Sequence, residues 1–149
     1  METLNKEQFV AYGNSKFTHS KLATRSLTIT AELGTKNAHF FKKNNVLIQL
    51  VHSDIPVKEN HLAELKKGDD FGNRDLQDVN HYTSEIKAIH NNHVLIMYND
   101  WENVGYYNVH CWSNIYNHGL TIALQFDLAN KAKATQILND ILNGVEFKN

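Results

Sequence analysis

The clearest pattern of hydrophobic and polar positions lies in the second half of the chain. Four segments have the length and composition of β-strands: residues 85–90, 93–98, 105–112 and 120–126. The shortest connection, between the first two segments, consists of Asn91 and Asn92. Asparagine tolerates the positive φ angles that a two-residue hairpin turn requires. No crossover fits between the four segments, so the pattern predicts an antiparallel meander.

An amphipathic helix is predicted directly after the fourth strand. Asp127 suits its N-cap, and Gly144 is expected to end it. Its apolar residues recur at helical spacing: Ala134, Ile137, Leu138, Ile141 and Val145. One such stripe covers one face of a sheet. Residues 145–147 are expected to add a short edge strand.

The first half gives weaker patterns. Asn5 and Gln8 have the spacing of a capping box, which predicts an N-terminal helix ending at residues 13–15. Residues 25–33 alternate apolar and polar positions, as a half-buried strand does. Residues 46–51 are a short apolar run typical of a central strand.

A second helix is predicted after this run, capped by Ser53 or Asp54 with Pro56 in its first turn. Gly68 is the expected residue after its C-terminus, and residues 69–80 are interpreted as a polar loop, with one helical turn within it as an alternative. Together the patterns predict a single α+β domain over residues 1–149, an antiparallel sheet with helices packed on it.

Composition narrows the function classes. The 42% hydrophobic and 21% charged residues are typical of a folded domain. Proteins that bind nucleic acid usually carry a basic stripe, and the net charge of −1 does not indicate one. Cys111 is the single cysteine, and no stretch approaches the ~20 apolar residues of a membrane helix. As written, the sequence predicts a cytoplasmic protein. Removal of a signal peptide would instead leave an exported or periplasmic one.

The last sixty residues also have a familiar order: a strand–turn–strand, a long aromatic strand, a further strand, then a helix ending at Gly144 before Val145. This order resembles the PsbP-like superfamily. The superfamily includes the extrinsic photosystem II subunit, Ran-binding nuclear-import release factors and bacterial chaperones of type VI secretion effectors. The resemblance implies an α/β/α sandwich around a curved antiparallel sheet, and non-catalytic work on a partner protein. No family site motif matches, so no functional residue is carried over.

An aromatic group is the first candidate site. Its members are Trp101, Tyr106, Tyr107, Trp112 and Tyr116. Strand parity places Tyr106 and Trp112 on one face of the sheet and Tyr107 on the other. If one face is left open, these side chains supply a partner-binding surface. The alternative is that a further helix, such as the N-terminal one, covers that face.

Histidines are the second candidate. His90 and His93 flank the predicted turn, where they would oppose one another and share Zn²⁺ or Cu²⁺, with His110 or His118 as a third ligand. The alternative is an ordinary polar pair at an exposed turn. No HExxH or CxxC spacing supports a metal site, and no cofactor is expected.

A cysteine-dependent hydrolase is the third hypothesis, because His110 precedes Cys111. Neighbouring strand residues point to opposite faces, however, so the pair cannot meet. The leading hypothesis is therefore a non-enzymatic protein-binding or accessory module of unknown partner, and a small-ligand or metal-binding protein is the alternative.

Overall fold

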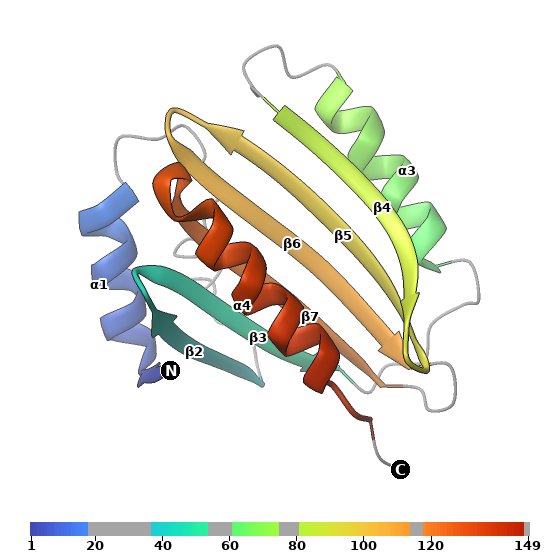
Figure 1. The fold of residues 1–149 in the computed structure, drawn as a ribbon, viewed down its shortest axis with the longest axis horizontal. Coiled ribbons are helices and arrows are strands. Elements are labelled where there is room, and N and C mark those ends of the chain that lie inside the picture. Colours follow the sequence, from blue (N-terminus) through green and yellow to red (C-terminus); the bar gives the residue numbers. More distant parts are fainter. Residues whose placement is uncertain (18–36, 54–60, 75–80, 114–117, 148–149) are drawn as a thin grey trace.

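The computed structural model describes residues 1–17, 37–53, 61–74, 81–113 and 118–147. Within these ranges the chain forms one seven-stranded antiparallel sheet (Figure 1). The strands are β1 (Glu2–Leu4), β2 (Ala38–Lys43), β3 (Val46–Ser53), β4 (His81–Ile89), β5 (Asn92–Trp101), β6 (Val104–Ser113) and β7 (Gly119–Asp127). The helices are α1 (Lys6–Phe17), α3 (His61–Arg74) and α4 (Lys131–Gly144), the last preceded by the short 3₁₀ helix η2 (Leu128–Asn130).

The strand order is β1-β2-β3-β7-β6-β5-β4, so β1 and β4 form the two edges. The predicted meander is confirmed, because β4, β5, β6 and β7 are consecutive neighbours. The predicted central strand is β3, which pairs with both β2 and β7. Tight turns join two of the hairpins, and both residues of each turn have positive φ: Asn44 with Asn45, and Glu102 with Asn103.

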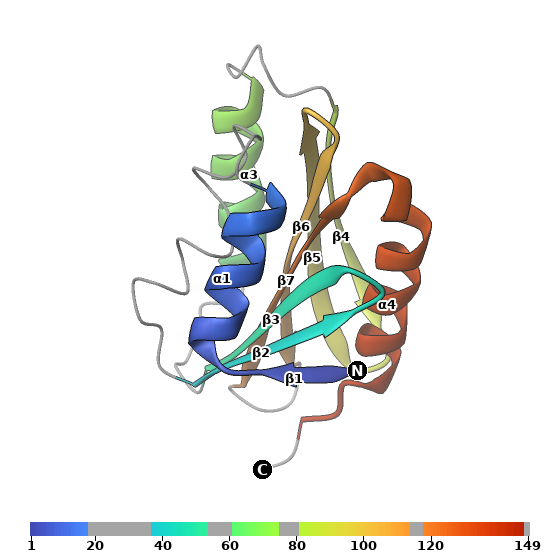
Figure 2. The ribbon, with the colours of Figure 1, turned by 90° about the vertical axis from the view of Figure 1, so that its left-hand side faces the viewer.

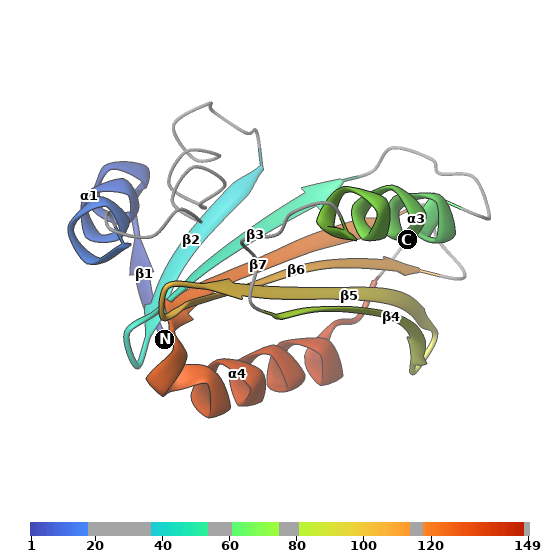
Figure 3. The ribbon, with the colours of Figure 1, turned by 90° about the horizontal axis from the view of Figure 1, so that it is seen from above.

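Helices cover both faces of the sheet. Figures 2 and 3 show α4 on one face and α1 with α3 on the other, which is the predicted α/β/α layering. The face under α4 carries the larger core. It is built from alternate residues of the central strands and from the apolar stripe of α4: Val46, Ile48, Val94, Val109, Ile122, Leu124, Phe126, Ala134, Ile137, Leu138 and Leu142. Each large aliphatic side chain buried there stabilises the fold by roughly 1.5–3 kcal/mol.

The opposite face carries two smaller cores. Phe9 and Phe17 of α1 pack on Leu47 and Ala123. Farther along the sheet, Leu62 of α3 packs on Leu95 and Met97. The capping box before α1 is confirmed: the backbone N–H of Gln8 donates to Asn5 Oδ1 at 2.8 Å, and the N–H of Asn5 donates to Gln8 Oε1 at 2.9 Å.

Several predicted boundaries are wrong. α1 continues through residues 13–15 to Phe17, because Gly13 is buried in the helix rather than placed after it. α3 continues through Gly68 to Arg74, so the first residues of the predicted loop 69–80 are helical. Bonds one turn apart extend this helix, from Lys66 Nζ to Asp70 Oδ2 at 2.6 Å and from Asn73 Nδ2 to the Asp69 carbonyl at 2.8 Å.

The end of the chain also differs from the prediction. Asp127 ends β7 and forms an ion pair with Lys16 at 3.1 Å rather than capping a helix with its side chain. Residues 145–147 join no strand of the described sheet. The sequence patterns also missed β1 and β2, and the predicted strand 25–33 lies outside the described residues.

Two glycine substitutions test this packing. A Cβ at Gly105 would lie 2.4 Å from the Phe126 ring, so Gly105→Ala should lower the free energy of unfolding by about 1–3 kcal/mol. Gly68→Ala has nothing within 4 Å and lies inside α3, so it should raise that free energy by about 0.5–1 kcal/mol. Urea denaturation measures both. If Gly68→Ala instead lowers the free energy of unfolding, the result would support the helix end that the sequence predicted at that residue.

Candidate functional site

The predicted aromatic group divides between the two faces as strand parity requires. Trp101 and Tyr106 pack beside the core under α1, and Trp112 packs beside the core under α3. The Trp112 ring meets His61 edge-on, with 6.0 Å between ring centroids. Tyr107 lies on the α4 face, is 8% exposed, and its hydroxyl is 2.8 Å from Thr135 Oγ1. Tyr116 lies outside the described residues.

Helices α1 and α3 therefore cover much of the sheet face on which an open aromatic surface was predicted. The N-terminal helix is one of them, as the alternative interpretation proposed. Trp101, Tyr106 and Trp112 remain half-buried, and their partner-binding role stays a prediction.

A layer of buried amides lies on this same face, between the cores of α1 and α3. Gln125 of β7 is fully buried, and neither polar atom of its side chain has a hydrogen-bond partner within the described residues. Gln49 Oε1 and Asn99 Oδ1 are buried in the same way. Tyr106 lies directly opposite both Asn99 and Gln125. An unpaired buried polar group costs about 1–3 kcal/mol.

Burial disfavours the charged forms of two titratable groups on this face. It raises the pKa of Tyr106 to about 12, and the Asp69 carboxylate acts in the same direction. It lowers the pKa of His110, and the neighbouring His61 adds to that effect. Both shifts favour the uncharged forms of Tyr106 and His110.

Acidic side chains of α3 hold that helix against the edge strand β4. Tyr82 Oη donates to Asp69 Oδ2 at 2.9 Å and to Asp70 Oδ1 at 2.7 Å. Ser84 Oγ also donates to Asp70. Burial alone would raise the pKa of Asp70, but the bonds from Lys66, Ser84 and Tyr82 outweigh it and lower the pKa to about 2.

A groove of about 580 Å³ lies on the other face, between α4 and β4. In Figure 1, α4 crosses the middle of the sheet and β4 lies at its edge. Residues from β4, β5, β6 and α4 line the groove: His81, Thr83, Ser84, Glu85, Lys87, Ile96, Tyr98, Tyr107, Lys131, Thr135, Leu138 and Asn139.

One end of the groove holds a hydrogen-bonded network around Asp100, which is 3% exposed. His81 Nδ1 lies 3.0 Å from Asp100 Oδ1, and Tyr98 Oη donates to Asp100 Oδ2 at 2.8 Å. Lys131 Nζ lies 4.3 Å from the centre of the Tyr98 ring. The buried carboxylate orients the exposed imidazole and leaves its Nε2 directed away from Asp100. This arrangement provides a fixed hydrogen-bonding group at the end of the groove.

The edge strand itself is the second part of the site. All nine residues of β4 pair with β5, and no strand pairs with its outer side within the described ranges. Glu85 and Lys87 face the groove, with their charged atoms 3.8 Å apart. Ile86 faces the α3 side and is 41% exposed. Such an edge presents a row of backbone N–H and C=O groups that another strand can pair with.

The histidine hypothesis is corrected by the hairpin register. The β4–β5 turn is His90 and Asn91, one residue earlier than predicted, and Ile89 pairs with Asn92. His93 consequently pairs with Ala88 and Trp112, not with His90. The turn does not need two asparagines, because His90 itself adopts a positive φ of 56°.

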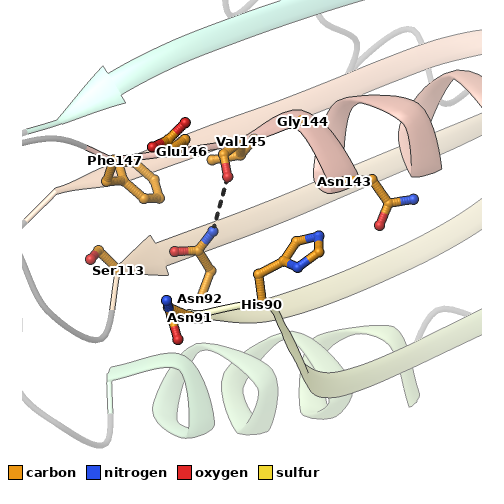
Figure 4. A pocket seen from close by; sticks show the side chains of 9 residues that line it. All are labelled: His90, Asn91, Asn92, Ser113, Asn143, Gly144, Val145, Glu146 and Phe147. Carbon is orange, nitrogen blue, oxygen red and sulfur yellow. Dashed lines mark hydrogen bonds between the residues drawn. The ribbon is translucent and has the colours of Figure 1, made fainter.

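His90 instead borders a polar pocket of about 440 Å³ at the C-terminal end of α4 (Figure 4). Asn92 Nδ2 donates to the Val145 carbonyl there, at 3.5 Å. His93 and His110 lie on the α3 face, away from this pocket. In the part of the chain that the structure describes, no three His, Cys, Asp or Glu side chains are grouped to hold a metal.

Cys111 lies in the core under α4, fully buried, and burial raises its thiol pKa to about 11. His110 lies on the opposite face, as parity predicted. A buried thiol that remains protonated is a poor nucleophile.

The sequence matches no protein-family model and no curated protein. Among the described helices, none is long and apolar enough to span a membrane. The resemblance to the PsbP-like superfamily stays a prediction.

Acid titration tests the α3–β4 contact. A pKa of about 2 in the folded protein, against an ordinary 3.8, gives stability that is present above about pH 4 and lost as pH falls toward 2. Asp70→Asn should cost about 1 kcal/mol at pH 7, since the carboxylate is partly exposed, and should flatten the loss of stability between about pH 5 and 2. Urea denaturation at each pH measures this. Asp140→Asn, an exposed change on α4, is the control and should leave the profile unchanged.

The buried amide layer gives a second test. Gln125→Met keeps the side-chain length and removes both unpaired polar atoms, so it should raise the free energy of unfolding by about 1 kcal/mol. Gln136→Met, on the exposed side of α4, should change it by less than about 0.5 kcal/mol. A clear loss of stability in Gln125→Met would mean that the amide is hydrogen-bonded in solution.

Proposed function

We propose that the protein is a non-enzymatic accessory module that binds an extended segment of another polypeptide along β4. The observation that carries this proposal is the nine-residue edge strand with a groove beside it. A chain that adds to a sheet edge gains main-chain hydrogen bonds, and its alternate side chains enter the adjoining pockets and give specificity.

The two faces of β4 define the chemistry of the bound segment. Its groove-side residues would lie beside Glu85 and Lys87, with the oriented imidazole of His81 at one end. Its other residues would lie beside Ile86 and Ala88. The matching segment is therefore an amphipathic strand, with charged or polar residues on one side and apolar residues on the other.

This proposal keeps the protein-binding function expected from the sequence and moves it to another surface. The half-buried Trp101 and Trp112 pack under α1 and α3, whereas the backbone edge of β4 pairs with no other strand within the described residues. The predicted resemblance to PsbP-like proteins, which implies work on a partner protein, agrees with it.

A labelled peptide tests the proposal. The probe is a blocked nonapeptide in which valine alternates with glutamate and lysine in turn, followed by fluorescence anisotropy. We expect saturable binding with a Kd of about 10–100 μM, because main-chain pairing and one apolar stripe supply modest affinity. Ile86→Asp should weaken it at least about tenfold.

Phe71→Asp is the matched control, because Phe71 is also an exposed large hydrophobic residue, at 62%, but lies on α3. It should leave the affinity unchanged. At protein concentrations where the chain is monomeric, binding that is absent up to millimolar peptide, or equally sensitive to both substitutions, would contradict strand addition at β4.

A further inference from the structure

The sequence of β4 is complementary to itself. Glu85 precedes Ile86 and Lys87 follows it, so the exposed apolar residue lies between opposite charges. When two copies of a strand pair antiparallel about a two-fold axis, the residue on the axis faces itself and its two neighbours face one another across it. An axis at Ile86 therefore places Glu85 opposite Lys87 of the second copy, twice.

We infer that the segment bound by β4 is the β4 strand of a second copy of this chain. The inference rests on the proposed strand addition and names its partner. The two-fold axis is perpendicular to the sheet, because only that axis keeps each face continuous across paired edge strands. The dimer thus has one continuous antiparallel sheet, with both copies of α4 on one face and both copies of α3 on the other.

Charge selects this register over its neighbours. Opposite residues must point to the same face of the sheet. The axis therefore lies midway between two copies of the same residue, and not between two successive residues of the strand. An axis at Glu85 or at Lys87 would set two like charges directly opposite one another, which destabilises strand pairs. An axis at Ile86 pairs each glutamate with a lysine on the groove side. It also pairs Ile86 with its own copy on the α3 side.

The remaining pairs of this register are compatible as well. Ser84 lies opposite Ala88 of the second copy, and Thr83 lies opposite Ile89. In the single chain Lys87 and Glu85 already lie 3.8 Å apart, with side chains 45% and 62% exposed. Pairing therefore exchanges the solvated contact within each of the two strands for two contacts across the axis.

Charge exchange tests the inference by sedimentation velocity at about 1–200 μM protein. The wild type should form a dimer with a dissociation constant in the micromolar range. Glu85→Lys sets lysine against lysine at both of these pairs, and Lys87→Glu sets glutamate against glutamate; each should weaken the dimer at least about tenfold. The double variant Glu85→Lys/Lys87→Glu restores opposite charges and should return within about threefold of the wild type.

Control substitutions on exposed helix positions, Glu7→Lys in α1 and Lys133→Glu in α4, make the same changes in net charge and should leave the dimer unaffected. A chain that is monomeric throughout, a dimer insensitive to Glu85→Lys, or a double variant as weak as the single ones would overturn the inference. If such a monomer still binds the valine-based nonapeptide with dependence on Ile86, strand addition stands and only self-pairing is lost. If the monomeric chain does not bind the nonapeptide either, both proposals are lost.

Discussion

Burial of the apolar stripe of α4 across the centre of the sheet is the interaction on which the rest of the structure depends. Ala134, Ile137, Leu138 and Leu142 meet the inward-facing residues of the meander and of β3, and this contact joins both halves of the chain into one core. A helix is narrower than a seven-stranded sheet. Centred as it is, α4 leaves β4 outside its cover, and the groove beside β4 follows from that difference in width.

The sequence predicted the parts of the fold whose signals are local. The four meander strands and α4 have clear periods, so their existence, order and antiparallel direction were recoverable. The β4–β5 turn was placed one residue late because His90 adopts a positive φ, a choice that residue identity does not reveal beside two asparagines. Gly68 suggested a helix end, but hydrogen bonds of Asp70 and Asn73 continue α3 past it. The first strands were missed because β1 has three residues and β2 lacks alternation.

The candidate site was less accessible from the sequence, since its parts meet only through register. Parity placed Tyr106 and Trp112 on one face, yet whether a helix covers that face depends on tertiary packing. His81 and Asp100 are nineteen residues apart and become partners because they lie opposite one another in the β4–β5 pair. Correct strand boundaries would have revealed this pair, and also the shared face of Glu85 and Lys87. The groove needed the position of α4 as well.

The two edges of the sheet are treated differently. β1 is only three residues long, and a short edge strand offers little for another chain to pair with. β4 is three times as long and contains no proline, so length and composition do not protect it. Its charges are one remaining protection. A lone lysine on an edge opposes association with a second copy, because pairing sets lysines close together. In the proposed pairing, Glu85, two residues from Lys87, converts that repulsion into complementarity in one register.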